Sequence, residues 1–490
     1  MRSFCSMYES ETRTDIALLT AALFLQRFEL KNFGAIPFPL IASSLIFAYQ
    51  FATGRLLIQY DRLLWFLLLG VAATSALYFN FATFRLSSYF VFLTVYFFFT
   101  LMHPSNAGRY KKTLQGFQFL ILVLACLGIL QFLGQFMFDG MKIIMFFGLI
   151  PDAFLQNLAI YNGPDEQLGA NTIIPIPGSS LIKSNGIFLS EPSVLSAMTA
   201  LGILIEILEF RRPRYLILLA LGLLLSYSGT GILILLFTLP LTALVHTRAQ
   251  LPAVLVVSFA LTLIGTGIID ASVFTSRIGE FEDVNTSGFQ RFISSFWMTA
   301  EHFDTASLQA LIRGNGPAAM KEFVHVANYG SLGNTWFKLL YEYGLIGALI
   351  FTGFLASCFR ASWCPKPLMV ALIYSYLFGA DNLINTYFLT IMVVLCTLSG
   401  PAPRIGRVDE LVDSRASLVL GRKYADHKSV EKEVPHLRTT GLGSGQTRLY
   451  VSNAEIEAAG HKPRFTRSMT ASRELIKGYT TMQKPLRERT

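Results

Sequence analysis

Three arginines in one long polar segment are the residues of this chain best suited to binding an anion. Arg277, Arg291 and Arg313 lie 14 and 22 residues apart within residues 269–333, and each has a glycine within three residues. A guanidinium is a planar fork of donors that matches phosphate oxygens, and it stays charged at any useful pH. The flanking glycines let the backbone approach a ligand closely. The alternative is that these arginines pair with neighbouring acidic residues in a solvated loop.

A second polar string, Lys183–Ser193, reads KSNGIFLSEPS. Glu191 precedes Pro192 where a helix is expected to begin, and a carboxylate is stabilised at the positive end of a helix dipole. Glu191 is therefore either a helix cap or a functional carboxylate that takes a proton from a substrate hydroxyl. Lys183 and Asn185 are expected to contact substrate, Lys183 through a phosphate or a carboxylate.

Other polar residues extend this set. His325 is a candidate general base because histidine titrates near neutral pH, although a loop histidine is often idle. Asn334 follows the 269–333 segment where an apolar helix resumes, and it is grouped with the substrate contacts. The string SYSGTG at 226–231 predicts a tight turn or close helix packing. Asp381, Asn382 and Asn385 are polar residues at the end of an apolar run. Polar residues in this position either have a function or mark a loop.

Several kinds of chemistry leave no trace in the sequence. It contains no metal-ligand cluster, no phosphate-binding Gly-Lys-Ser loop and no nucleotide-binding fingerprint. We therefore expect no metal and no cofactor. The expected substrate arrives already activated, as a lipid-linked diphosphate does, because its leaving group supplies the driving force.

These residues are set in a membrane protein. Hydrophobic residues make up 53% of the chain, 42 residues are Phe and 14% are charged, which excludes an ordinary soluble domain. Crossing about 30 Å of hydrocarbon takes roughly 20 residues of helix, and backbone groups in lipid must be paired. The predicted fold is an all-α polytopic membrane protein of about twelve spans: 14–30, 34–53, 63–82, 87–103, 114–138, 193–210, 215–228, 230–246, 252–269, 334–358, 367–385 and 386–400.

The distribution of Lys and Arg among the loops predicts orientation. Basic residues gather in alternate loops and in the tail, which places both termini in the cytoplasm. The long segments 139–192 and 269–333 are then external. Residues 1–400 form the predicted membrane domain. Residues 401–490 hold 17 Lys or Arg against 10 Asp or Glu, and this composition predicts a disordered tail that adsorbs to anionic lipid rather than to nucleic acid.

The order of these features resembles the superfamily of O-antigen ligases and polymerases, and most closely the Wzy-type polymerases of exopolysaccharide systems. The strings that carry the resemblance, in order along the chain, are Ser184–Ser193 (SNGIFLSEPS), Leu225–Leu233 (LSYSGTGIL), Ser287–Arg291 (SGFQR), Arg313–Ala318 (RGNGPA) and Gly333–Gly347 (GNTWFKLLYEYGLIG). Together with the layout of spans, the resemblance covers residues from about 15 to 400.

The resemblance implies a GT-C-like helical fold in the bacterial inner membrane, with the large loops periplasmic. Its implied reaction joins undecaprenyl-diphosphate-linked glycan repeat units without nucleotide sugar or metal. Arg291 occupies the family's functional arginine position, and Arg277 and Arg313 are secondary choices. A chain-length regulator and a flippase are further candidate partners, beside the lipid bilayer.

Two departures from the family pattern affect the site. Lys183 stands where many members have arginine, which keeps the charge but loses bidentate geometry. Gly333 stands before Asn334 where ligase-like members have histidine, which leaves Glu191 or His325 as the expected proton acceptor. The rival functions are an O-antigen-ligase-like transferase and a transporter of polysaccharide or lipid-linked sugar. The missing histidine disfavours the ligase, and the shortage of charged residues within spans disfavours the transporter.

Overall fold

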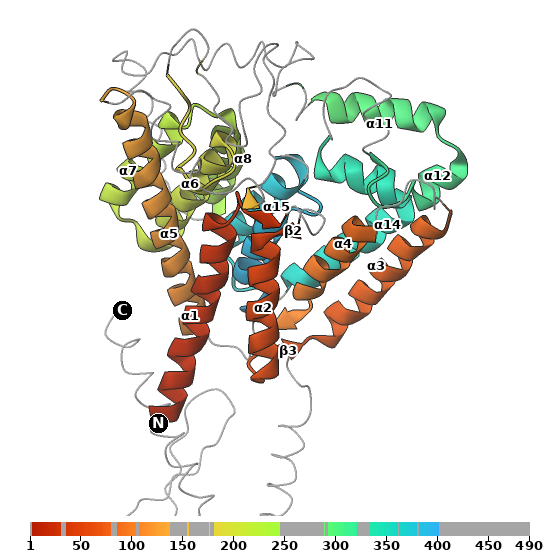
Figure 1. Ribbon diagram of the computed structural model, residues 1–490, viewed down its shortest axis with the longest axis horizontal. Coiled ribbons are helices and arrows are strands. Elements are labelled where there is room, and N and C mark those ends of the chain that lie inside the picture. Colours follow the sequence, from red (N-terminus) through yellow and green to blue (C-terminus); the bar gives the residue numbers. More distant parts are fainter. Residues whose placement is uncertain are drawn as a thin grey trace, which may run out of the picture. The chain divides into compact units, whose positions relative to one another are not determined.

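The fold was examined in a computed structural model that is mostly helical (Figure 1). The structure describes residues 2–30, 36–79, 86–103, 107–137, 154–155, 176, 181–245, 289, 293–320, 333–360, 362–379 and 382–400. Its first helices are α1 (Arg2–Phe24), α2 (Phe38–Ala52), α3 (Tyr60–Phe79), α4 (Leu86–Phe98) and α5 (Ala107–Gly134). Then come α6 (Pro192–Ile205), the π-helix η4 (Glu206–Phe210), α7 (Pro213–Leu225) and α8 (Gly229–Val245). The last are α11 (Ser294–Thr305), α12 (Leu308–Arg313), α14 (Thr335–Arg360), α15 (Lys366–Phe378), α16 (Thr386–Met392) and the π-helix η7 (Val393–Thr397).

The described strands are two-residue pairs that fasten loops between helices. The strand β1 (Glu29–Leu30) pairs with β2 (Ile36–Pro37), and β3 (Leu57–Ile58) pairs with β4 (Leu101–Met102), both antiparallel. All other described elements are helices, so the prediction of an all-α protein is confirmed for the described residues. The predicted external loops fall largely outside them, and the tail 401–490 falls entirely outside.

Three described helical stretches are long and apolar enough to cross a membrane. They are Gly108–Gly134, Pro192–Phe210 and Thr335–Arg360, with mean hydropathies of 2.3, 1.8 and 1.6. Shorter apolar helices, α2, α4, α7 and α15 among them, lie at other predicted spans. The predicted span 252–269 lies outside the described residues. Twelve spans and a GT-C architecture therefore stay predictions, whereas helices suited to a membrane are found.

Proline sets the start of several of these helices. Pro192 and Pro213 occupy the first helical position of α6 and α7, where a missing N–H costs nothing and a fixed φ favours the helix. The expected helix start after Glu191 is thereby confirmed. The helix α1 differs from its predicted span 14–30, because it begins at Arg2 and ends at Phe24.

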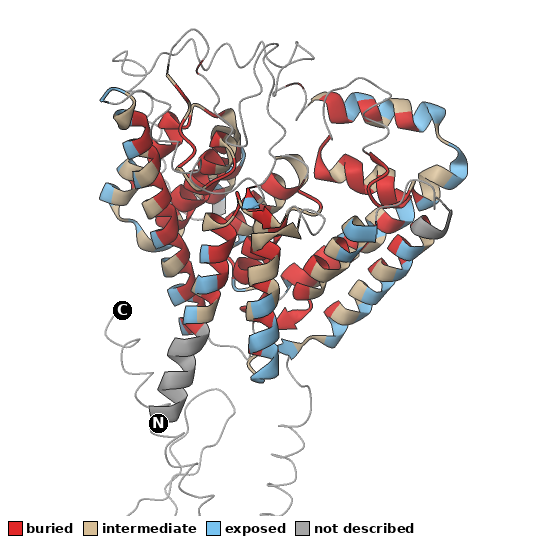
Figure 2. Ribbon diagram, in the orientation of Figure 1, coloured by how far each residue is buried: buried red, intermediate tan, exposed pale blue. Residues whose placement is uncertain are grey.

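Glycine lets the helices around α6 approach closely, and these helices form part of the continuous buried core (Figure 2). A Cβ on Gly231 of α8 would lie 2.6 Å from the carbonyl carbon of Ser196. The Ser196 hydroxyl donates to the Ser228 carbonyl and accepts from the Gly231 N–H, at 3.0 and 2.9 Å. The string at 226–231 thus forms both a turn and a close helix contact, as expected.

Candidate functional site

The Lys183–Ser193 string is fixed to the end of α5 by one glutamine. The Gln131 side-chain oxygen accepts from the Ser184 hydroxyl at 3.0 Å and from the backbone N–H groups of Asn185 and Gly186 at 3.0 and 3.1 Å. Gln131, Ser184 and Asn185 are buried, so these bonds are shielded from water. One turn further along, Gln135 both donates to and accepts from the Ile182 backbone.

The same string turns sharply at Gly186 and Ile187. Both have left-handed backbone conformations, with φ of 69° and 67°. A β-branched residue rarely adopts positive φ, because its side chain crowds the backbone there. The Asn185 side-chain oxygen stabilises the turn by accepting from the Ile187 N–H at 3.1 Å. That oxygen of Asn185, a predicted substrate contact, is therefore engaged in holding its own turn.

Replacing Gln131 with leucine is expected to release this turn. The buried N–H groups of Asn185 and Gly186 would lose their acceptor, at about 1–3 kcal/mol for each donor left unpaired. Trypsin should then cleave after Lys183 several-fold faster than in the parent protein. The control is Leu130→Ala, on the exposed side of the same helix. Equal cleavage rates in Gln131→Leu and the control would contradict the anchoring role.

Glu191 lies at the N-cap position of α6, but its side chain makes no capping bond to the helix backbone. Its Oε2 instead accepts from the Ser193 hydroxyl at 2.7 Å. The preceding residues are held by the turn that follows α1, since Arg27 Nε donates to the Leu189 carbonyl at 2.9 Å. Glu191 is half-buried. The Glu191 carboxylate is thus engaged with the Ser193 hydroxyl rather than with the N-terminus of the helix.

The RGNGPA string is joined to α14 backbone to backbone. Asn315 N–H donates to the Tyr341 carbonyl and Gly316 N–H to the Glu342 carbonyl, both at 2.9 Å. The helix α14 is kinked at Gly344, where φ is 65° and ψ is −175°. The kink lets α12 approach, so a Cβ on Gly344 would lie 2.5 Å from Gly314 N. Glycine is required on both sides of this contact.

The strained backbone of this string continues past the contact. Gly314, Gly316 and Ala318 all have positive φ, at 83°, 93° and 68°. Arg313, a predicted phosphate contact, ends α12 and is exposed immediately before the strained turn. A glycine-rich turn of this kind fixes the place from which the guanidinium extends.

Asn334, another predicted substrate contact, begins α14 beside α11. Its backbone N–H donates to the Ser295 hydroxyl at 2.7 Å, and its side chain is fully buried. The next residue, Thr335, accepts through its hydroxyl from the Asn382 N–H at 2.8 Å. Asn382 and Asn385 are in turn hydrogen-bonded to each other, and Asn385 caps α16 through the Phe388 N–H. These two asparagines therefore organise the loop before α16.

The described residues divide the predicted site into two groups. Lys183, Asn185 and Glu191 share the segment held by α5 and α1, whereas Arg313 and Asn334 belong to the α11–α14 region. Three further predicted residues lie outside the described residues, namely Arg277, Arg291 and His325.

Buried charged clusters are a feature that the sequence reasoning missed. Asp15 is fully buried and accepts from Arg109 through both carboxylate oxygens, at 2.8 and 2.7 Å from Nη2. His103 and Thr113 also contact this carboxylate, at 3.2 and 3.1 Å. The sequence signal for such a cluster is a single charged residue at the end of an apolar run. The sequence does not show which of these charged residues pair with each other in the fold.

A second cluster holds the π-helix η4 in place. Glu206 is fully buried and accepts from Arg212 Nη2 at 2.5 Å and from the Gln118 side chain at 3.0 Å. The Gln118 amide also donates to the Gly202 carbonyl at 3.1 Å. The cluster joins α5, α6 and the start of α7 at the basic run Arg211, Arg212 and Arg214. It is suited to structural cohesion rather than to binding a substrate.

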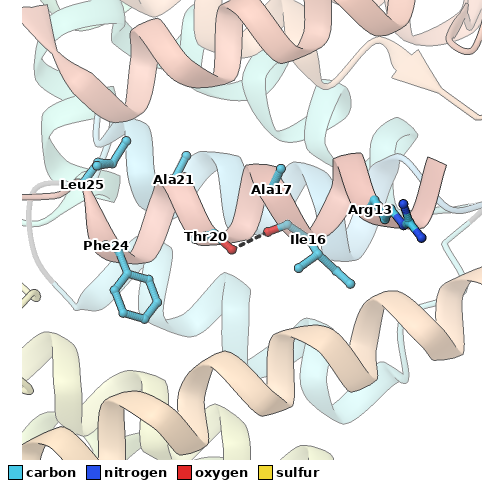
Figure 3. Close-up of a pocket in the computed structure, with 7 residues that line it drawn as sticks. All are labelled: Arg13, Ile16, Ala17, Thr20, Ala21, Phe24 and Leu25. Carbon is cyan, nitrogen blue, oxygen red and sulfur yellow. Dashed lines mark hydrogen bonds between the residues drawn. The ribbon is translucent and has the colours of Figure 1, made fainter. Parts of the chain in front are cut away.

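A groove of about 480 Å³ runs along one side of α1 (Figure 3). Its lining residues are Arg13, Ile16, Ala17, Thr20, Ala21, Phe24 and Leu25. The Thr20 hydroxyl turns back to the Ile16 carbonyl of its own helix, at 2.8 Å. With this hydroxyl engaged, the groove is apolar except for Arg13 at one end, and its lining lacks the converging polar groups of a substrate site.

Within the described ranges, no three His, Cys, Asp or Glu side chains are grouped as a metal ion would require. Comparison with known proteins yields no matching family model, no matching curated protein and no matching solved structure.

Proposed function

We propose that this protein is a membrane glycosyltransferase that polymerises glycan repeat units carried on undecaprenyl diphosphate. The reaction would take place at the outer face of a bacterial inner membrane, with both termini in the cytoplasm. The donor supplies its own leaving group, so the reaction needs no nucleotide. Its proposed partners are a flippase that delivers the lipid-linked units and a regulator of chain length.

One observation carries the proposal. Two of the strings that resemble polymerase motifs, at 184–193 and 313–318, form strained polar turns beside helices. A non-glycine residue at positive φ is uncommon, and Ile187 and Ala318 are two of the four among the described residues, beside Arg211 and Tyr227. Local strain of this kind gathers at ligand sites, where the surrounding structure over-determines the backbone. The turns therefore favour binding functions for Lys183, Glu191 and Arg313.

The proposed mechanism uses arginines as fixed cations. Arg291, with Arg277, Arg313 and Lys183, would hold the donor diphosphate and stabilise the negative charge that grows on it. The acceptor hydroxyl oxygen attacks the anomeric carbon as the bond from that carbon to the diphosphate oxygen breaks. The hydroxyl proton passes to Glu191 or His325, and the carrier diphosphate leaves.

The test is the size distribution of glycan in cells that lack the protein and carry either the parent chain or Arg291→Ala. Long polymer is expected with the parent chain, and single repeat units are expected with Arg291→Ala. A matched control, Arg473→Ala in the basic tail, should give long polymer. Equal amounts of each variant in the membrane are verified by immunoblot. Long polymer with Arg291→Ala would exclude the assignment of that residue, and long polymer in cells without the protein would exclude the polymerase.

A further inference from the structure

The helix α11, from the predicted external segment 269–333, packs on the first turns of the predicted span α14 through a layer of polar and aromatic side chains. Ser295, Met298 and His302 are spaced three and four residues apart, so they share one face of α11. This face meets the first turns of α14. Ser295 accepts from the Asn334 N–H at 2.7 Å, and the His302 ring lies 4.8 Å from the Tyr341 ring.

This layer contains buried polar atoms without partners. Among the described residues it holds the Asn334 side-chain oxygen and nitrogen, His302 Nε2 and Trp336 Nε1, all enclosed and lacking a hydrogen bond. Asn334 is 0% exposed and His302 is 2% exposed. Each unpaired buried group costs about 1–3 kcal/mol, and such groups are rare in folded proteins. Several in one layer indicate a function that offsets the lost stability.

The chemistry of these atoms defines the ligand that would satisfy them. The asparagine amide offers an acceptor oxygen and two donor hydrogens, and the indole offers one donor. Burial lowers the pKa of His302, so its imidazole is uncharged at neutral pH and has one donor and one acceptor nitrogen. A set of uncharged donors and acceptors matches sugar hydroxyls, which both donate and accept. It matches a phosphate poorly, because the amide oxygen would repel an anion.

Aromatic rings flank the unpaired atoms. Trp336 lies 5.3 Å from Phe296 and 6.2 Å from Phe337, measured between ring centroids. Aromatic faces bury the apolar C–H surface of a ligand while the polar groups beside them orient it.

We propose that the layer between α11 and α14 binds an uncharged sugar ring of the acceptor glycan through the Asn334 amide, the Trp336 indole N–H and His302 Nε2. The assignment of this sugar to the acceptor glycan rests on the proposed function. The presence of a sugar-binding site does not. The enclosed atoms come into reach when α11 separates from α14. Sugar binding therefore changes the surroundings of Trp336.

The first test measures stability without any ligand. Asn334→Leu removes two unpaired polar atoms and keeps nearly the same shape, so the thermal midpoint of the purified full-length protein should stay the same or rise. The comparison variant is Asn382→Leu, whose amide and backbone are hydrogen-bonded, and its midpoint should fall. A fall in Asn334→Leu as large as that in Asn382→Leu would overturn the proposal, because Asn334 would then be a structural residue.

The second test measures binding through the fluorescence of Trp336. The chain has four tryptophans, so Trp65→Phe, Trp297→Phe and Trp363→Phe together leave Trp336 as the reporter. This protein is titrated in detergent with the methyl glycosides of glucose, galactose and N-acetylglucosamine, and with sodium pyrophosphate. We expect a saturable change with at least one glycoside and none with pyrophosphate. Asn334→Leu should weaken binding at least tenfold, and His302→Phe should weaken it as well.

Three results would overturn the sugar site: no saturable change with any glycoside, a response to pyrophosphate alone, or unchanged binding in Asn334→Leu. The proposed function fails separately. If a glycoside binds at Trp336 but cells without the protein still make long polymer, the sugar site stands and the polymerase does not. If polymer requires the protein but Trp336 does not respond, the function stands and this site does not.

Discussion

Gly314→Ala is expected to lower the free energy of unfolding by about 3 kcal/mol or more. Gly314 has φ of 83°, which costs an L-residue energy by itself. A Cβ there would also lie 2.5 Å from both the Glu342 carbonyl carbon and the Tyr343 nitrogen. Backbone atoms in a packed helix cannot move aside to relieve this contact, whereas the end of a flexible side chain can. The contact between α12 and the α14 kink should therefore open.

Two other glycines of the chain separate the effect of positive φ from the effect of the close backbone contact. Gly54 also has positive φ, at 67°, but has no atom within 4 Å of its hypothetical Cβ, so Gly54→Ala measures the backbone term. Gly229 likewise has open space there and no positive φ, so Gly229→Ala should be nearly neutral. The expected order of thermal midpoints, from highest to lowest, is Gly229→Ala, Gly54→Ala, Gly314→Ala. A Gly314→Ala midpoint equal to that of Gly54→Ala would contradict the close backbone contact.

Asp15→Asn is expected to destabilise the protein by about 3–5 kcal/mol, because it leaves the Arg109 guanidinium buried without a counter-charge. Both side chains are at most 2% exposed, so water cannot replace the lost partner. Thermal unfolding can be followed by alkylation of Cys358 and Cys396, which are buried in the folded protein. Alkylation should begin at a markedly lower temperature in the variant.

The matched control is Asp61→Asn, an exposed acid in the first turn of α3, which should change the midpoint little. The double variant Asp15→Leu with Arg109→Leu should recover much of the loss, since it removes both charges together. An Asp15→Asn midpoint equal to that of Asp61→Asn would show that the buried pair contributes nothing. A double variant less stable than Asp15→Asn would show that the charges are needed for folding.

The buried charges also bear on the transporter hypothesis. A shortage of charged residues within the predicted spans was the argument against it, yet Asp15, Arg109 and Glu206 are buried among the helices. Asp15 is paired with Arg109 of α5, and Glu206 is paired with Arg212 in the connection to α7. Such clusters suit cohesion between helices. The number of charged residues therefore does not disfavour a transporter. What disfavours it is that these buried charges are paired with other side chains of the protein.

Helix positions were predictable because they follow from local patterns. Apolar runs of span length placed α6 and α7 to within a few residues, and Pro192 marked the start of α6. The start of α1 was missed, because residues 2–13 mix polar and charged residues with a few apolar ones, and hydropathy cannot distinguish such a helix from a loop.

The candidate site was less predictable, because its geometry depends on contacts between distant residues. Glu191 was placed correctly at the start of a helix, whereas its bond to Ser193 was not foreseen. Gln131 gave no sequence signal, since a glutamine in an apolar helix does not reveal that it accepts three hydrogen bonds 53–55 residues away. The unpaired atoms of His302 and Asn334 became visible only from packing.

The most direct test of the central claim is reconstitution of the purified protein in liposomes with lipid-linked glycan extracted from cells that lack it. The account predicts a ladder of products that each differ by one repeat unit, with release of undecaprenyl diphosphate. Arg291→Ala should give no ladder, and Arg291→Lys should give a weaker one, because lysine keeps the charge without the bidentate fork. No lengthening with the parent protein, or an equal ladder with Arg291→Ala, would contradict the account.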